Sequence, residues 1–497
     1  MKKIALNICA CVLLVVSWSC STDRDDELGP VSFLEIKNFI YDGMQLYYLY
    51  KPDVPELAND FFESRDERND FLNSFDTPES FFYNGLVAPV DRFSFITDDY
   101  RELERSFAGI SKTSGIEYGL SLDRNDPNFA FAWVRYVLPD TPASEAGVER
   151  GMLFNSINGE RLTTTANADG TYSLSARSRE LLNLDTFSID LAEFDANDDL
   201  QPTGESIALT QVEYTENPVF IAKTLTVNNR KIGYLMYNAY RRNFDVELNN
   251  AFAQFESDGI EDLVLDLRYN GGGSVETAID LTSMITGQFN GQIITKQRWN
   301  PEIQAVLESE NPESLIDRFD NTISNGNAIN SLNLTRLFVI GTGSTASASE
   351  LTITGLDPYI DVKTVGTTTV GKFQASITLY DSDDFTRNDK SLNPRHFYAI
   401  QPLVYTYENA DGVVGPPTGI SPDFELREDL SNLGILGESN EPLLSLALDQ
   451  ILGRSHAGKS RSGIKVEPFK SVENPGIDFQ RMYIDQLPKA LQNQRKL

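Results

Sequence analysis

The alternation of strand-like and helix-like segments between residues 216 and 455 places the strongest constraint on the fold. An apolar run at 231–237 precedes a helical pattern at 246–252. A second apolar run, 263–267, leads into a glycine turn, and a third occupies 337–341. Apolar strands that alternate with helices are typical of a layered α/β domain. The sequence therefore predicts an α/β domain over residues 216–455.

The rest of the chain differs in pattern, and 497 residues are too many for one core. Residues 33–110 carry aromatic side chains at helical spacing and predict a small helical N-terminal domain. Short alternating runs fill 114–214, which predicts a β domain. Residues 456–497, rich in basic side chains, proline and glycine, are expected to form a partly ordered tail. The fold class expected is multidomain α+β.

The β region resembles a PDZ domain. Residues 139–151 read as a strand end, a short helix and a glycine stop, and residues 157–162 contain an Asn-Gly turn. Such domains bind a peptide carboxylate with backbone N–H groups and pair a strand edge with the peptide. The place of the carboxylate-binding loop is taken by four residues: Gly119, Leu120, Ser121 and Leu122. A small β domain that serves as a spacer is the alternative interpretation.

The N-terminus has the pattern of a secretory signal over residues 1–20. Two lysines precede an apolar stretch, Ile4 to Val16, that is too short for an ordinary membrane-spanning helix. Cys20 lies where a bacterial lipoprotein signal places its lipidated cysteine, and residues 21–32 read as an acidic tether. We expect a lipid anchor at Cys20 in the outer membrane of a Gram-negative-type cell envelope, on its periplasmic or surface face. Plain secretion is the alternative.

Charge and cysteine content narrow the partners further. The formal charge is −31, which argues against nucleic acid and against peripheral binding to anionic lipid. Two of the three cysteines lie inside the signal, so the mature chain cannot form an intrachain disulfide. No metal-ligand spacing is present, and no cofactor is expected.

The candidate chemistry lies in two segments 25 residues apart. Ser347 lies in Gly343–Glu350, where a strand gives way to a helix, and Lys372 lies among apolar and glycine neighbours. A serine hydroxyl needs a base, and a buried lysine whose pKa is lowered by desolvation can serve. The only histidines are His396 and His456, so a Ser-His-Asp triad through His396 stays open.

Backbone donors for an oxyanion are predicted beside these side chains. The N–H of Ala348 follows the nucleophile at a helix start, and Gly272 or Gly273 would supply the second donor. Each segment alone also has an ordinary interpretation. Ser347 to Glu350 spells a helix capping box, Lys372 reads as a loop lysine, and the glycines form a turn.

Taken together, these segments resemble the C-terminal processing peptidases, also called tail-specific proteases. The matching motifs are Ser-Ala-Ser-Glu at Ser347, Gly-Lys at Lys372, Asp266–Gly273, and Gly419–Asp423. The resemblance covers about residues 115–425. It implies a crotonase/ClpP-like catalytic domain with a Ser/Lys dyad and a PDZ domain that captures substrate C-termini.

One departure from the family concerns the residue that orients the lysine. Where the family often has glutamine, four residues after the lysine, this chain has Ser376, and a glutamine lies at Gln374 instead. Either residue is a candidate third member of the site.

The expected function is an extracytoplasmic serine endopeptidase that hydrolyses polypeptides near their C-termini. Two alternatives from other classes remain. The first is a catalytically inactive PDZ-containing lipoprotein that binds peptides as an adaptor. The second is an acyl-CoA enzyme, because the glycine turn also suits a crotonase oxyanion hole, although the export signal argues against a cytoplasmic cofactor.

Overall fold

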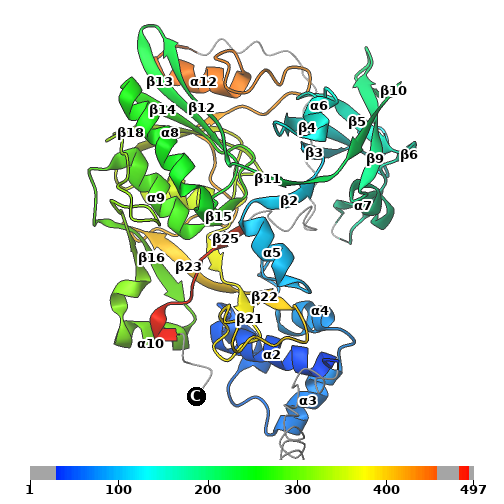
Figure 1. Cartoon of the computed structure of the whole chain (residues 1–497), viewed down its shortest axis with the longest axis vertical. Helices are drawn as coiled ribbons and strands as arrows, with labels where there is room; N and C mark the ends of the chain where they lie inside the picture. Colours follow the sequence, from blue (N-terminus) through cyan, green and yellow to red (C-terminus); the bar gives the residue numbers. More distant parts are fainter. Residues whose placement is uncertain (1–29, 169, 456–480, 492–497) are drawn as a thin grey trace, which may run out of the picture.

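The computed structural model describes residues 30–168, 170–455 and 481–491 (Figure 1). The predicted signal, Cys20 and most of the acidic tether lie outside the described residues. No helix within the described ranges has both the length and the apolar character needed to cross a membrane.

The N-terminal region is helical, as its aromatic spacing predicted. Helix α2 (Phe33–Tyr47) begins at Ser32, whose hydroxyl accepts from the Glu35 N–H while the Glu35 carboxylate accepts from the Ser32 N–H. The elements that follow are η2 (Lys51–Asp53), η3 (Pro55–Leu57), α3 (Arg65–Asn73), α4 (Pro78–Phe81), η4 (Phe82–Leu86), β1 (Phe95–Thr97) and α5 (Tyr100–Phe107).

The N-terminal region shares its core with the α/β domain. The apolar stripe of α2, with Phe39 and Met44, packs into one continuous core with that domain. Strand β1 pairs with β22 (Ala399–Gln401) and β22 with β21 (Leu379–Tyr380). An amphipathic helix must bury its apolar face, and the nearest large apolar surface belongs to the α/β domain.

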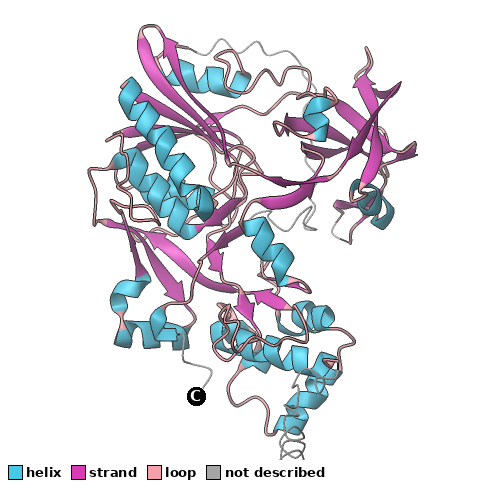
Figure 2. Ribbon diagram, viewed as in Figure 1, coloured by secondary structure: helices cyan, strands magenta, loops and turns pink. Residues whose placement is uncertain are grey.

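The β-rich region lies at one side of the molecule (Figures 1 and 2) and has its own core. Its main sheet has the order β10-β9-β5-β4-β3, with β6 paired to β5. The elements are β3 (Ile116–Leu122), β4 (Ala130–Val137), α6 (Pro142–Glu145), β5 (Leu153–Ile157), β6 (Glu160–Arg161), β7 (Thr164–Ala166), β8 (Tyr172–Leu174), α7 (Ala176–Leu182), β9 (Thr186–Phe194) and β10 (Leu200–Thr210). A ribbon of β2 (Ile110–Thr113) and β11 (Val212–Thr215) joins it to the remainder.

The α/β domain is built on a six-stranded sheet of order β12-β13-β14-β18-β19-β24, parallel except for β12. Strands buried on both faces read as continuous apolar runs, which explains Leu263–Leu265 and Leu337–Ile340. The strands are β12 (Val219–Val227), β13 (Arg230–Tyr237), β14 (Asp262–Asp266), β18 (Arg336–Gly341), β19 (Asp361–Gly366) and β24 (Phe424–Glu425).

Helices cover both faces of this sheet, as the α/β prediction requires (Figure 2). Helix α12 (Pro442–Ile451) packs on one face, against Val264 and Phe338. The other face meets α8 (Asp245–Asp258), α9 (Val275–Thr286) and α11 (Ala348–Leu356). Helix η5 (Arg242–Phe244) leads into α8.

A second sheet has the order β15-β25-β20-β23-β16-β17. Its strands are β15 (Gly272–Ser274), β16 (Ile293–Trp299), β17 (Ile316–Arg318), β20 (Gln374–Ser376), β23 (Leu403–Asn409) and β25 (Arg481–Tyr483). Helices α10 (Pro301–Glu310), η6 (Pro312–Leu315) and η7 (Lys489–Leu491) lie beside it.

Strand β25 corrects the prediction of a tail. Residues 456–480 and 492–497 lie outside the described part, but residues 481–491 belong to the core. Met482 and Leu491 have no exposed surface, and the Leu491 carbonyl accepts from the Tyr47 hydroxyl. The apolar side chains among these residues are buried against a sheet that the rest of the chain forms. The composition of the segment alone therefore does not reveal that it is part of the core.

Candidate active site

Three loops that carry the sequence motifs follow three neighbouring parallel strands. The glycine turn follows β14, the Ser347 loop follows β18, and the Lys372 loop follows β19. The carboxyl ends of parallel strands lie at one edge of a sheet, which is where α/β proteins place their sites. The topology therefore brings together three segments that span more than one hundred residues of sequence.

Ser347 occupies a strained position at the start of α11. Its φ of 70° lies in the left-handed region that non-glycine residues rarely adopt. The residue has no exposed surface, and within the described chain its Oγ makes no hydrogen bond. A buried hydroxyl without a partner is costly unless it serves a purpose, which fits a nucleophile that awaits a substrate.

Glu350 joins the serine loop to the lysine loop. One carboxylate oxygen accepts the backbone N–H of both Ser347, at 2.8 Å, and Lys372, at 2.9 Å. The other oxygen accepts from the Gly371 N–H at 2.7 Å and from the Thr369 hydroxyl. The predicted capping interaction is thus present on the glutamate side, and the same carboxylate fixes the backbone of the candidate base.

Lys372 is almost fully buried and faces an aromatic ring. Its side chain is 1% exposed, and Nζ lies 5.2 Å from the centre of the Phe93 ring. Desolvation first, and then the nearby positive charge of Arg481, lower its pKa to about 7, against the opposing effect of Asp91 and Glu350. A large fraction of this amine is therefore uncharged at neutral pH, as a general base requires.

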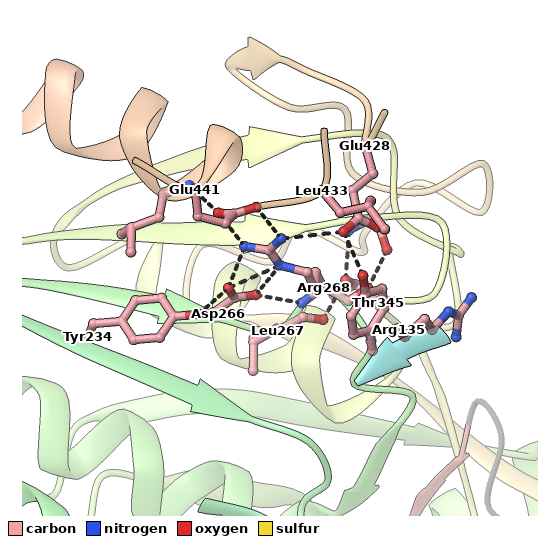
Figure 3. Close-up of polar contacts among 12 residues, drawn as sticks. Arg135, Tyr234, Asp266, Leu267, Arg268, Thr345, Glu428, Leu433 and Glu441 are labelled. Carbon is pink, nitrogen blue, oxygen red and sulfur yellow. Dashed lines mark hydrogen bonds and ion pairs between the residues drawn. The ribbon is translucent and has the colours of Figure 1, made fainter. Parts of the chain in front are cut away.

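A buried ion network supports the glycine turn (Figure 3). The guanidinium of Arg268, with no exposed surface, donates to Asp266 and forms two hydrogen bonds of 2.7 and 2.9 Å with the Glu441 carboxylate. The Tyr234 hydroxyl donates to Asp266 at 2.7 Å. Every charge in the network has a partner, so the network holds the end of β14 against the start of α12.

The serine loop is attached to this same strand end. The Thr345 hydroxyl donates to the Leu267 carbonyl at 2.7 Å, and the Thr342 hydroxyl donates to the Arg268 carbonyl. The Ala346 N–H donates to the Asn270 carbonyl. The nucleophile and the glycine turn are thereby fixed relative to each other.

The β-rich region contacts these loops directly. Arg135 on β4 donates to the Ser344 hydroxyl at 3.1 Å, and its guanidinium lies 4.8 Å from the centre of the Tyr269 ring. Arg150 donates to the Tyr269 hydroxyl at 2.8 Å and pairs with Glu428. Tyr269 lies between Arg268 and Asn270, so the β-rich region packs on the glycine motif itself.

Of the backbone N–H groups predicted to bind the oxyanion, some already donate to an acceptor within the protein. Ala348 is the first residue of α11, where a backbone N–H has no acceptor within the helix. The Gly272 N–H donates to the Asn270 side chain at 2.8 Å. The Tyr240 N–H donates to the Gly272 carbonyl, and the Ser274 N–H donates to the Tyr240 carbonyl. Because backbone groups alternate between the two edges of a strand, the N–H of Gly273 faces the other edge, toward β25.

The candidate third members and the histidine lie differently from expectation. The Ser376 hydroxyl donates to the Met482 carbonyl at 3.0 Å and to Gln401 at 3.2 Å, not to the lysine amine. Within the described residues, Gln374 makes no side-chain hydrogen bond to Lys372 either. Both ring nitrogens of His396 are engaged, by Asp381 and by the Tyr398 N–H, and neither bonds Ser347.

The predicted carboxylate-binding loop is a strand. Residues 119–122 lie inside β3 and pair with β4, with Gly119 opposite Trp133. A Cβ on Gly119 would lie 2.5 Å from the Trp133 indole nitrogen. The glycine therefore leaves room for the Trp133 ring and does not mark a loop. Strand β3 is nevertheless an edge of the described sheet.

Two contributors to the site carried no motif. Phe93 comes from the N-terminal region and Arg481 from β25, and both lie near the lysine. The only signal in the sequence was the apolar character of the segments around them. Ser347, Lys372 and the glycine turn, in contrast, were identified from local patterns.

Comparison with known proteins identifies two regions of the chain that contribute to this site. Residues 231–425 match "Peptidase family S41", and residues 35–95 match "Peptidase S41 N-terminal domain". A crystal structure of a Bacteroides fragilis NCTC 9343 protein assigned to the S41 proteases superposes with a TM-score of 0.63 at 26% identity, covering 86% of this chain and 98% of that one.

Two curated proteins are similar over shorter stretches. The "Carboxyl-terminal-processing protease" of Picosynechococcus sp. is 26% identical over 187 residues, which cover 38% of this chain and 41% of that protease. The "Probable CtpA-like serine protease" of Staphylococcus aureus strain N315 is 28% identical over 142 residues, 29% of this chain and 25% of that protein. The aligned part is thus less than half the length of these relatives. The matched domains and the shared fold nevertheless establish that the chain belongs to peptidase family S41.

Proposed function

We propose that this chain is an extracytoplasmic serine endopeptidase that cuts polypeptides near their C-termini, with Ser347 as nucleophile and Lys372 as general base. The observation that carries the proposal is the shared carboxylate of Glu350. Because one oxygen accepts the backbone N–H of both residues, the two loops converge on a single point. The burial of Lys372 adds the chemistry that this geometry needs.

The first chemical step is proton transfer from the Ser347 hydroxyl to the neutral Lys372 amine, with attack of Oγ on the substrate carbonyl carbon. The resting hydroxyl makes no hydrogen bond in the described structure, and substrate binding is the event that aligns it. The Lys372 ammonium then gives its proton to the departing amine. A water molecule, deprotonated by the same amine, hydrolyses the acyl-enzyme.

The tetrahedral intermediates place a negative charge near the start of α11. The Ala348 N–H donates to this oxygen, helped by the positive end of the helix dipole. The Gly272 N–H is the second donor, after it exchanges the neutral Asn270 amide oxygen for the charged one. A charged acceptor forms the stronger hydrogen bond, which favours this exchange.

The β-rich region captures the substrate's C-terminus in the manner of a PDZ domain. Strand β3 is an edge that an extended peptide can join, which supports this role. Arg135 and Arg150 place the region against the glycine motif and the serine loop, so that a captured chain lies near Ser347. The protein acts in the cell envelope, anchored through Cys20, as the signal-like N-terminus indicates.

The decisive experiment uses a fluorophosphonate probe and casein digestion on the purified full chain. We expect an adduct on Ser347 in the wild type and in Ser344→Ala, and loss of both adduct and digestion in Ser347→Ala. Peptides with free and amidated C-termini then test the C-terminal preference. A folded wild type that gives neither adduct nor cleavage, yet binds free C-termini, would identify a peptide-binding adaptor instead.

A further inference from the structure

Strand β25 lies inside the active site although its sequence lies beyond the S41 match. The family match ends at residue 425, and β25 begins at Arg481. In the second sheet, β25 lies between β15, which carries Gly272 and Gly273, and β20, which follows Lys372. Figure 1 shows β25 beside β15. A segment near the C-terminus therefore joins the oxyanion turn to the strand of the candidate base.

The backbone of Arg481 lies very close to the nucleophile. Arg481 pairs with Gly272 in parallel register. A Cβ on Gly272 would lie 2.2 Å from the Arg481 carbonyl oxygen and 2.7 Å from the Ser347 Cβ. Gly272 thus separates Arg481 from Ser347, and only a glycine fits between them.

The side chain of Arg481 lies close enough to that of Lys372 for their charges to interact. Its guanidinium carbon is 3.5 Å from the centre of the Phe95 ring, while the Lys372 amine faces Phe93, two residues earlier in the same segment. Arg481 is 7% exposed and Lys372 is 1% exposed. Two cations on neighbouring aromatic rings, both shielded from water, repel each other more strongly than they would at the surface.

Other charged groups oppose this repulsion. Asp91, in the loop before Phe93, and Glu350, on α11, both favour the charged lysine. Asp91 is itself engaged by the Tyr48 hydroxyl at 2.7 Å and by the N–H groups of Phe93 and Ser94. Glu350 is engaged by four donors. The positive charge that faces Lys372 comes from Arg481, and it adds to desolvation in lowering the lysine's pKa to about 7.

We propose that Arg481 is a positioning residue of the active site: its guanidinium, held on Phe95, places a second positive charge beside Lys372 and favours the neutral amine that accepts the serine proton. The inference rests on the proposed function, because a neutral amine matters only if Lys372 is the base. It extends the active site to a strand that lies more than fifty residues beyond the family match.

The first test is the pH dependence of kcat/KM and of Ser347 labelling in Arg481→Gln. Removal of one like charge should move the midpoint of the acid limb upward by about one pH unit, so the rate falls about tenfold at low pH and recovers above pH 9. Arg481→Lys keeps the charge and should keep the midpoint. Tyr483→Leu removes the stacking of β25 on Phe107 without a charge change, and should lower activity at all pH values without moving the midpoint.

The second test does not depend on catalysis. A double-mutant cycle of Arg481→Gln and Lys372→Met, measured by urea unfolding, should show repulsive coupling at pH 6 and none at pH 10. Coupling that is absent or independent of pH overturns the role of Arg481, even in an active enzyme. Coupling with the predicted pH dependence in a protein that never labels Ser347 would support the electrostatics and overturn the proposed function instead.

Discussion

Arg268 and Lys372 are both buried cations within the same domain, yet their surroundings are opposite. Arg268 is surrounded by carboxylates, and two oxygens of Glu441 accept from its guanidinium at 2.7 and 2.9 Å. Lys372 has an aromatic ring and a second cation beside it, and among the described residues no carboxylate accepts a hydrogen bond from its amine. Burial of a paired charge preserves it, whereas burial of an unpaired amine favours the loss of its proton.

This contrast separates the part of the candidate site that keeps the loops in place from the part that would react under the proposed function. The Arg268 network fixes the strand end from which the glycine turn departs. Lys372 is held by its backbone, through Glu350, while its amine remains available for a proton. A substitution at Lys372 tests the amine without disturbing the Arg268 network, and a substitution at Arg268 tests the network without removing the amine.

Lys372→Met gives the largest expected effect. Turnover should fall about 10⁴-fold, because no other described group replaces the base. The variant should also be more stable than the wild type at pH 6, by a few kcal/mol, because it no longer buries an ammonium. Casein digestion and urea unfolding measure the two effects, with Lys363→Met, a lysine on β19 paired with Asp361, as the control. A variant with wild-type turnover would remove lysine from the mechanism.

Arg268→Met should have the opposite effect on stability. It leaves Asp266 and Glu441, each 1% exposed, without their cation, which typically costs about 3–5 kcal/mol. Urea unfolding at pH 7 is the measurement, compared with Arg298→Met at an exposed pair with Glu408, for which about 0–1 kcal/mol is expected. Equal losses in the two variants would contradict the structural role of the network.

Glu350→Gln sharpens the comparison at the point where the two loops meet. An amide offers one acceptor oxygen in place of two, so its NH₂ group must face two of the four donors. We expect a fall in kcat of about 10²-fold with the fold retained, measured by peptide cleavage and circular dichroism. An unchanged kcat would show that the shared carboxylate does not position the dyad.

The pH dependence gives the smallest expected effect. Since the pKa of Lys372 lies at about 7, kcat/KM should rise about tenfold per pH unit below pH 7 and level off above it. The folded protein also binds fewer protons than the unfolded chain between pH 7 and 10.5, so the stability of the wild type relative to Lys372→Met should rise across that window. A rate maximum below about pH 6 would exclude the neutral amine.

Local patterns pointed to the candidate reactive residues and not to the residues that support them. The strands before the glycine turn and before Ser347 were expected from apolar runs, and the structure confirms them as β14 and β18. Glu350 was recognised only as a helix cap, because its other donors lie 19 to 22 residues farther along the chain. The sequence shows that Glu350 can cap its own helix, but it does not show that the Lys372 loop folds back to donate to the same carboxylate.

Long-range packing explains what the sequence did not reveal. Arg481 and Phe93 have no motif, and their place beside Lys372 arises from sheet order and from a core shared across the chain. The same shared core joins the N-terminal helices to the peptidase domain. In the β-rich region, residues 119–122 were expected to form a loop because of their place in the PDZ resemblance, whereas Gly119 lies in β3, where it accommodates the Trp133 ring.

The ribbon of β2 and β11 has a consequence for how such a chain can change. Both connections to the β-rich region run side by side, and at its base the Glu216 N–H donates to the Gly109 carbonyl at 2.9 Å. A direct connection between these two positions would therefore close the backbone without changing the strand order of either sheet of the peptidase domain. Under the proposed function, a deletion or exchange between these two positions would change the region that captures the substrate and would leave the order of both peptidase sheets intact.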